Sequence, residues 1–142
     1  MSKLLREIMT TDCVTASMQD TLFDVAVKMK THDIGIIPVV EGNKLEGVVT
    51  DRDLAIRGYA LKKDSTETVD QVMSREVTTA EPTMTVDEAA KLMATKKIRR
   101  LPVVENGNLV GIVAIGDMAV REIHENEASH ALSGISEPTK SV

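Results

Sequence analysis

The chain has 142 residues, the size of one ordinary domain, and its 42% hydrophobic and 27% charged residues exclude a disordered protein. A net charge of −5 and an aromatic content of 1% argue against nucleic acid as a partner, because phosphate binding relies on Lys and Arg and base stacking relies on aromatic side chains. A single Cys13, three scattered histidines (His32, His124 and His130) and no apolar run of membrane-span or signal-peptide length predict a cytoplasmic protein with no disulfide, no metal site and no membrane partner.

The first predicted element is a short extended segment around Val14 and Thr15. A helix follows it, because Thr21-Leu-Phe-Asp24 is a capping box in which the two polar side chains satisfy each other's backbone N–H groups. Apolar residues then recur at helical spacing, namely Leu22, Val25, Ala26 and Met29. The pattern indicates a helix of about ten residues that packs on an apolar surface.

A β-hairpin is predicted next. The β-rich runs at 36–40 and 45–49 are joined by Glu-Gly-Asn-Lys, a sequence typical of a turn. A second helix starts at Thr50 or Asp51 and continues toward Tyr59. The order of elements is therefore strand, helix, strand, strand, helix.

The same series of elements is repeated later in the chain. Residues 34–54 align with residues 98–118. Identical residues in this alignment include the pairs Pro38 and Pro102, Gly47 and Gly111, and Asp53 and Asp117. The second copy has its own capping box from Thr85, a hairpin with an Asn-Gly turn and a helix that starts near Gly116 and runs toward Ile123. Since two copies of such a unit bury their apolar faces against each other, we expect one pseudo-symmetric module of the α/β (α+β) class.

The boundaries follow from the repeat and from local composition. The first repeat is expected at 5–62, a polar linker at 63–67 and the second repeat at 68–125. The remaining residues, 126–142, have weak periodicity and many small polar residues, so they are expected to form a frayed or partly helical tail.

Two motifs resemble those of the cystathionine-β-synthase (CBS) domain. An h-P-V-V strand followed by G-h-h-T-x-x-D occurs at 37–40 and 47–53, and in weaker form at 101–104 and 111–117. Over roughly residues 5–125 the chain is therefore similar to a tandem CBS pair, also called a Bateman module. Its Thr-Asp-Arg-Asp sequence is similar to that of stand-alone bacterial CBS-pair proteins, a group that includes the hypoxic-response type.

The resemblance implies that an adenosine-containing ligand, either AMP, ADP, ATP or S-adenosylmethionine, binds in a cleft between the repeats. It also implies a disk-shaped homodimer, head-to-head or head-to-tail, that regulates a protein partner which the sequence does not identify. No cofactor is required beyond this regulatory nucleotide, and no pair of nucleophile and base or of catalytic carboxylates indicates an enzyme. The alternative interpretation is a structural dimerisation module with a vestigial, empty nucleotide pocket.

The candidate ligand-binding residues combine chemical type with a place in the motifs. Asp53 comes first, because a carboxylate can accept hydrogen bonds from both ribose hydroxyls, and the family uses this aspartate for that purpose. Pro38 has no N–H, so it is expected to leave the strand edge unpaired, with backbone groups free for a ligand. The full set is Thr15, Ile37, Pro38, Thr50, Arg52, Asp53, Arg99, Arg100, Leu101, Pro102 and Asp117.

Some of these assignments have alternatives. Thr50-Asp-Arg-Asp53 is also a capping box, so Asp53 can serve a helix, a ribose or both. Among the arginines that could hold phosphate, Arg99 and Arg100 are adjacent, and alternation along a strand is expected to place only one of them in the cleft. The second copy keeps Asp117 but lacks the threonine of the motif, so its site is expected to be the weaker one.

Overall fold

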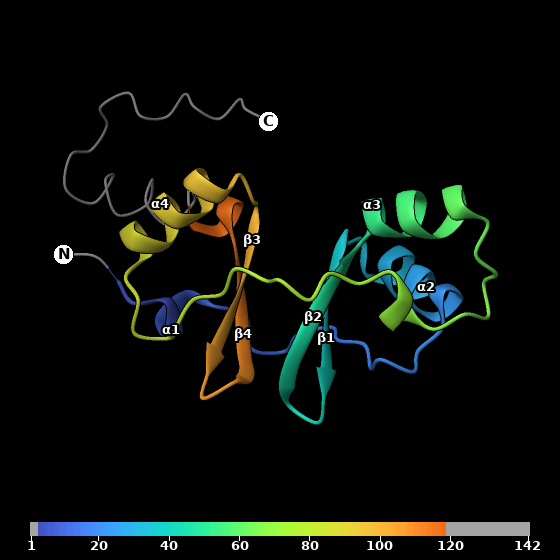
Figure 1. The fold of residues 1–142 in the computed structure, drawn as a ribbon. Helices are drawn as coiled ribbons and strands as arrows, with labels where there is room; N and C mark the ends of the chain where they lie inside the picture. The colour runs from blue at the N-terminus through green and yellow to red at the C-terminus, as the bar shows by residue number, and fades with distance from the viewer. Residues whose placement is uncertain (1–2, 119–142) are drawn as a thin grey trace.

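Each sequence repeat folds into a helix, a β-hairpin and a second helical segment, in a computed structural model that describes residues 3–118. The first repeat contains α2 (Leu22–His32), β1 (Ile36–Glu41), β2 (Lys44–Thr50) and α3 (Asp51–Asp53). The second repeat contains α4 (Val86–Lys96), β3 (Arg100–Glu105) and β4 (Asn108–Ala114). The two halves lie side by side (Figure 1), so the predicted α/β (α+β) fold of two pseudo-symmetric repeats is confirmed.

The long helix of each repeat begins at its predicted capping box. At the start of α2, the Thr21 side chain accepts a hydrogen bond from the Asp24 N–H, and the Asp24 carboxylate accepts one from the Thr21 N–H, each at 3.1 Å. The hydrogen bond from the Thr21 N–H, and to a lesser extent the Thr21 hydroxyl, hold the pKa of the Asp24 carboxyl below its ordinary value. Thr85 and Glu88 form the same reciprocal pair at the start of α4. Local sequence alone therefore fixes where both helices start.

The two hairpins form one four-stranded sheet with the order β1-β2-β4-β3. Within each hairpin the strands pair along their length, whereas β2 and β4, both fully described, pair only beside the hairpin turns. The Leu45 N–H donates to the Gly107 carbonyl at 3.1 Å and the Leu109 N–H donates to the Asn43 carbonyl at 2.8 Å. Away from this junction the hairpins diverge (Figure 1), which separates the repeats at the other end of the sheet.

The first predicted strand of each repeat is reduced to a single parallel bridge. Ala16 bridges to Val39 in β1, and Ala80 forms the equivalent bridge in the second repeat. The bridge is short because the chain bends away directly after it to reach the capping box. The Ala16 N–H donates to the Pro38 carbonyl at 3.0 Å, and the Ala16 carbonyl accepts from the Val40 N–H at 2.8 Å. The expectation that Pro38 leaves nearby backbone groups free is therefore wrong for the Pro38 carbonyl and the Val40 N–H, because both pair with Ala16.

The second helix of the first repeat is present but irregular. After α3 it continues as a π-helical turn at Leu54–Gly58 and a 3₁₀ turn at Tyr59–Leu61. In the second repeat, residues 115–118 are helical, and the rest of that predicted helix lies outside the described residues, as does the predicted tail at 126–142. None of the helices within residues 3–118 has the length and apolar character needed to cross a membrane.

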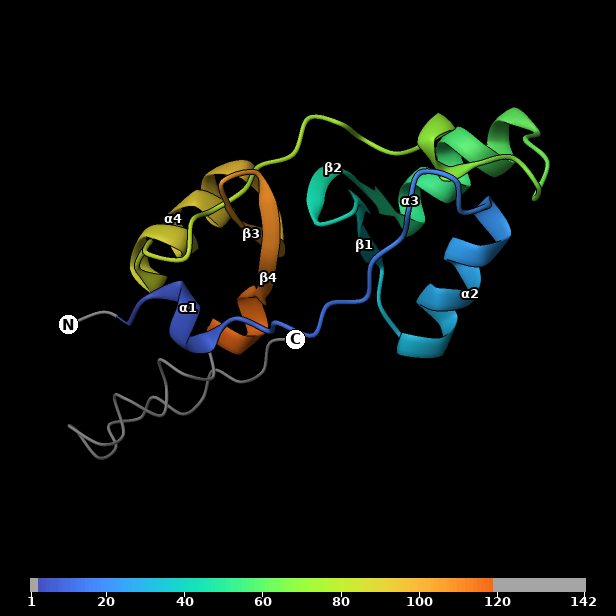
Figure 2. The ribbon, with the colours of Figure 1, turned by 90° about the horizontal axis from the view of Figure 1, so that it is seen from below.

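The segment that leads into each repeat packs on the other repeat. Residues of α1 (Leu5–Ile8) belong to the core of the second repeat, whereas those of a 3₁₀ turn at Val69–Gln71 belong to the core of the first. Both views show α1 beside β4 and α4 and away from α2 (Figures 1 and 2). The first residue of α1 donates its N–H to the Met84 carbonyl, and the first residue of the 3₁₀ turn donates to the Asp20 carbonyl, each at 2.8 Å. Neither core is built from one continuous stretch of chain.

We call these two lead-in segments, around residues 5–10 and 69–74, the exchanged segments. Each crosses over a glycine of the hairpin on which it packs. Val48 in β2 and Ser74 exchange two backbone hydrogen bonds, of 2.9 and 2.8 Å. A Cβ on the neighbouring Gly47 would lie 2.5 Å from the Ser74 carbonyl oxygen, and one on Gly111 would lie 3.0 Å from the Thr10 carbonyl oxygen. A side chain at either glycine would therefore push the crossing backbone away.

Replacing Gly47 by alanine is expected to lower the free energy of unfolding by about 1–3 kcal/mol, because the new methyl group forces the crossing backbones apart. Gly116→Ala is the matched control, since a Cβ there meets no described atom within 4 Å, and its expected effect is below about 0.5 kcal/mol. Urea denaturation followed by circular dichroism measures both changes. Equal stability of Gly47→Ala and the wild type would contradict the crossing.

Candidate functional site

A cleft of about 560 Å³ lies between the two repeats, at the end of the sheet opposite the hairpin turns. The first repeat contributes Gly35, Ile36 and Thr50 to its wall, and the second contributes residues 98–100 and 114–117. The cleft therefore brings together these predicted site residues: Thr50, Arg99, Arg100 and Asp117.

Equivalent backbone hydrogen bonds frame both sides of the cleft. The Asp51 N–H donates to the Gly35 carbonyl, and the Ile115 N–H donates to the Arg99 carbonyl, each at 2.9 Å. A Cβ on Gly35 would lie 2.9 Å from the Asp51 carboxylate, so the first repeat has no room for a side chain where the second has Arg99. The two walls share one backbone geometry but differ in charge.

Both adjacent arginines contribute to the wall of the cleft. β3 begins at Arg100, which is half-buried, while Arg99 precedes the strand and is exposed. Strand alternation does not apply to Arg99, which lies before β3, so whether one or both guanidinium groups serve the cleft stays a prediction. Within residues 3–118, neither guanidinium takes part in an ion pair. The third candidate, Arg52, is exposed on α3 and lies away from this wall.

Thr50 and Asp53 form the capping box that their spacing predicts. The Thr50 hydroxyl accepts from the Asp53 N–H, and the Asp53 Oδ2 accepts from the Thr50 N–H, each at 3.0 Å. The other carboxylate oxygen lies 3.9 Å from the Arg57 Nε, and the Asp53 side chain is 16% exposed. The cap is therefore confirmed, and it occupies only one of the two oxygens. Thr50 itself is on the cleft wall, whereas Asp53, three residues later in the chain, is not among the residues that line it.

The predicted apolar wall lies deeper than expected. Four of its proposed members are buried within the strands, namely Ile37, Pro38, Leu101 and Pro102. The residue that reaches the cleft instead is Ile36, which pairs with Thr50 across the hairpin. The pairing of Ile36 with Thr50 could have identified it, because a residue that pairs with a wall residue across a hairpin lies on the same wall. Thr15 is half-buried and lies outside the cleft wall, and its carbonyl accepts from the Lys28 Nζ at 2.7 Å.

Cys13 has the properties of a structural residue. Partial burial, and to a lesser extent the nearby Asp12 carboxylate, raise the pKa of its thiol above the ordinary value. Its Sγ lies 3.5 Å from the Thr10 carbonyl oxygen, to which it donates. A thiol with a raised pKa stays protonated and is a poor nucleophile.

The CBS domain family model matches the chain twice, at residues 5–57 and 69–122. The CBS domain-containing protein YhcV of Bacillus subtilis is 45% identical over 132 residues, which are 93% of this chain and 94% of YhcV. Hypoxic response protein 1 of Mycobacterium tuberculosis is 30% identical over 135 residues, which are 94% of both proteins. The solved CBS domain pair of protein MJ0100, in complex with 5-methylthioadenosine and S-adenosyl-L-methionine, superposes with a TM-score of 0.76. It is 28% identical and covers 88% of this chain and 99% of that one.

One related structure bears on metal binding. A crystal structure of Hypoxic Response Protein I with two coordinated zinc ions has a TM-score of 0.75 and 30% identity, covering 84% of this chain and 98% of that one. In this chain, residues 3–118 contain no group of three His, Cys, Asp or Glu side chains placed to hold a metal ion. His124 and His130 lie outside the described residues, so for the whole chain the absence of a metal site stays a prediction.

Replacing Ala114 by threonine is expected to raise the free energy of unfolding by about 0.5–1 kcal/mol, because the new hydroxyl can cap residues 115–118 as Thr50 caps α3. Thermal unfolding should show a rise in Tm of about 2–5 °C. Ala114→Val is the matched control, since valine has the shape of threonine without the hydroxyl. The same rise in both variants would show that shape, and not capping, is responsible.

Proposed function

We propose that this chain, which belongs to the CBS domain family, is a regulatory module that binds an adenosine-containing nucleotide in the cleft between its two repeats. The family match confirms the resemblance predicted from the two motifs. The proposal is carried by the convergence of Thr50, Arg99, Arg100 and Asp117 on one cleft. We propose no catalytic role, no resident cofactor and a cytoplasmic location.

The wall offers a group for each part of a nucleotide. Apolar side chains from both repeats, those of Ile36, Ile98 and Ile115, suit a purine ring. Thr50 on the wall and Asp53, which follows it in the cap, suit the ribose. The cap uses one carboxylate oxygen of Asp53, and the other, which lies 3.9 Å from the Arg57 Nε, can also accept from a hydroxyl. The ribose assignment of Asp53 thus agrees with its capping role.

The charge of the wall favours a phosphorylated ligand. Two arginines, Arg99 and Arg100, and one acidic residue, Asp117, line the cleft. Guanidinium groups bind phosphate through charge-assisted hydrogen bonds, whereas the sulfonium of S-adenosylmethionine carries a positive charge. AMP, ADP or ATP is therefore favoured over S-adenosylmethionine, although the MJ0100 pair was solved with the latter.

Regulation would follow from the shared wall. A ligand that touches both repeats favours whichever relative arrangement of them gives it more contacts. If the repeats can adopt two arrangements, the ligand can change the affinity for another protein. The size of that change is limited by the difference in the ligand's own affinity for the two arrangements. The protein partner would be one whose affinity depends on how the two repeats are arranged.

A homodimer is proposed through the outer face of the first repeat. The chain has one Phe and one Tyr, and both are exposed: Phe23 on α2 by 61% and Tyr59 by 88%. Further apolar residues of the helical segments of this repeat are exposed as well: Val27 on α2, and Ile56 and Leu61 after α3. Exposed aromatic side chains are typical of an interface. The same face supports the second candidate function, a structural dimerisation module.

Adenine nucleotides are expected to raise the Tm of ligand-free protein by about 5–10 °C, because a ligand at about 100 times its Kd adds roughly 2.7 kcal/mol to stability. Asp53→Asn should then weaken the best nucleotide roughly tenfold in calorimetry, since a neutral amide is a weaker acceptor than a carboxylate and still accepts from the Thr50 N–H.

Asp117→Asn is the comparison variant. Asp117 is on the wall but belongs to the copy that lacks the threonine of the motif, so its loss is expected to weaken binding less than the loss of Asp53. Equal losses in both variants would contradict the ranking of the two sites. If millimolar AMP, ADP, ATP, GTP and S-adenosylmethionine all leave Tm unchanged, the dimerisation module is the better description.

Phe23→Glu is expected to weaken the homodimer at least about tenfold, because it places a charge in the centre of an apolar contact. Light scattering at micromolar concentration measures the change in mass. Asp87→Lys is the control, since Asp87 is exposed at the equivalent position of α4 and lies outside the proposed interface. A wild-type protein that is monomeric at this concentration would rule out the dimer.

A further inference from the structure

The second repeat has a groove of its own, apart from the cleft between the repeats. It has a volume of about 700 Å³ and lies between residues 79–84 and α4. Its apolar wall residues include Met84 and Leu92, which also pack against the second core. The residues that line it are different from those that line the cleft, so the proposed nucleotide site does not use this groove.

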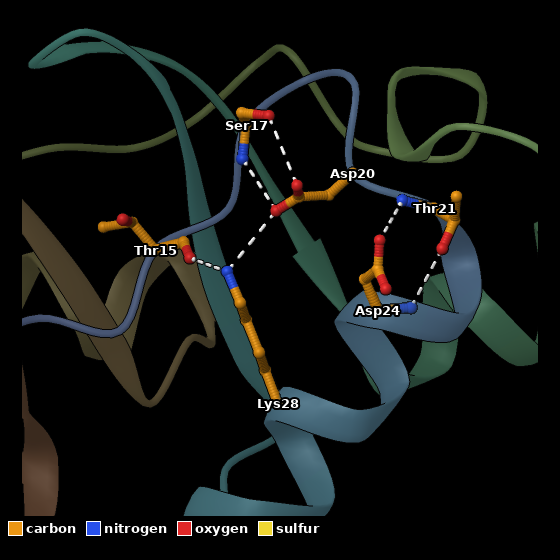
Figure 3. Close-up of polar contacts among 6 residues, drawn as sticks. All are labelled: Thr15, Ser17, Asp20, Thr21, Asp24 and Lys28. Carbon is orange, nitrogen blue, oxygen red and sulfur yellow. Dashed lines mark hydrogen bonds and ion pairs between the residues drawn. The ribbon is translucent and has the colours of Figure 1, made fainter.

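In the first repeat, a lysine side chain occupies the equivalent place. The Lys28 Nζ on α2 donates to the Thr15 carbonyl oxygen at 2.7 Å and lies 3.4 Å from the Asp20 Oδ2 (Figure 3). A hydrogen bond from an ammonium group is stronger than one between neutral groups. The first repeat therefore shows which chemical group its backbone accepts at this position.

The Thr79 carbonyl of the second repeat has the same orientation as the Thr15 carbonyl. The next residue, Ala16 or Ala80, donates its N–H to the proline of its hairpin, at 3.0 and 2.9 Å respectively. Because a trans peptide group is planar and its C=O and N–H point in opposite directions, both threonine carbonyls point away from their hairpins. Thr79 lines the groove, and no backbone N–H within residues 3–118 donates to its carbonyl.

The side chains around this carbonyl differ from those of the first repeat. Leu92 stands at the position of Lys28, so no ammonium group of the long helix is available at this position. Two carboxylates, those of Glu81 and Glu88, and one ammonium group, that of Lys91, lie on the groove wall. Two negative charges against one positive charge leave an excess of one negative charge. A cation in the groove therefore meets a backbone acceptor and a wall of favourable charge.

We propose that this groove is a second ligand site, which binds the ammonium group of a small linear alkyl amine. The ammonium donates to the Thr79 carbonyl, as the Lys28 ammonium donates to the Thr15 carbonyl. The alkyl chain lies on Leu92, and the Glu81 carboxylate supplies the negative charge. Since α4 already supplies the root of the missing lysine side chain, the groove lacks only a short chain and its charged end. This inference does not depend on nucleotide binding.

The chloride salt of n-pentylamine, titrated at constant ionic strength, is expected to bind with a Kd of about 1–10 mM, because a charged hydrogen bond and a short apolar chain give modest affinity. Nitrogen-15 NMR of the full chain measures binding as a saturable shift of the Ala80 amide, which shares its peptide group with the Thr79 carbonyl. n-Pentanol, which has the same chain without the charge, is the control and should require at least about tenfold more.

Three results of this titration would overturn the proposal. The first is an equal response to n-pentanol, which would make the groove a merely apolar surface. The second is the absence of a saturable shift of the Ala80 amide with n-pentylamine. The third is a shift with Nα-acetyl-lysine amide but not with n-pentylamine, which would make a protein lysine the occupant.

Two variants test the position of the amine. Leu92→Lys supplies an ammonium group from α4 itself, so n-pentylamine should no longer shift the Ala80 amide. Because Leu92 packs against the second core, Glu81→Gln is the second variant, which changes only an exposed residue and should weaken n-pentylamine about threefold to tenfold. Glu105→Gln is the matched control, since Glu105 is exposed at the end of β3. An unchanged Kd in Leu92→Lys and Glu81→Gln would overturn the site.

Discussion

Both repeats depend on a close backbone crossing. In each hairpin, a lead-in segment from the other repeat passes over one glycine, Gly47 or Gly111, and forms a reciprocal pair of hydrogen bonds beside it. The crossing carries Val69 into the first core and Leu5 into the second. Since each repeat holds part of the other's core, the two walls of the cleft are held in a defined relation to each other.

The two repeats have closely matching backbones but different side chains at many equivalent positions. Equivalent hydrogen bonds occur at the bridges, the crossings and the frame of the cleft. The side chains at equivalent positions differ, however: Gly35 is equivalent to Arg99, and Lys28 is equivalent to Leu92. Backbone geometry is what keeps the two halves packed, so it tolerates little change, whereas the side chains at the cleft are free to differ. One site can thus be specialised while the other retains only the architecture.

Much of the fold follows from local rules that a single sequence contains. Capping boxes at Thr21 and Thr85 locate two helices, and the β-rich runs locate both hairpins. The exchange of lead-in segments could not be predicted in this way, because periodicity identifies an apolar face but not the distant surface it packs on. The cleft was only partly predictable for a related reason. Whether Ile36 or its neighbour Ile37 faces the cleft depends on strand register, which the sequence leaves open.

The exchanged lead-in segment also sets the order of events during synthesis. α1 is made before the rest of the module, yet its hydrogen-bond partners Pro82 and Met84, and the Ile112 that pairs with the following Thr10, come much later in the chain. Its apolar side chains therefore stay uncovered while most of the module is translated. During that interval a neighbouring finished chain offers the same docking surface. Exchange of α1 between two chains, a domain swap across the crossing, is therefore the misassembly that this architecture invites.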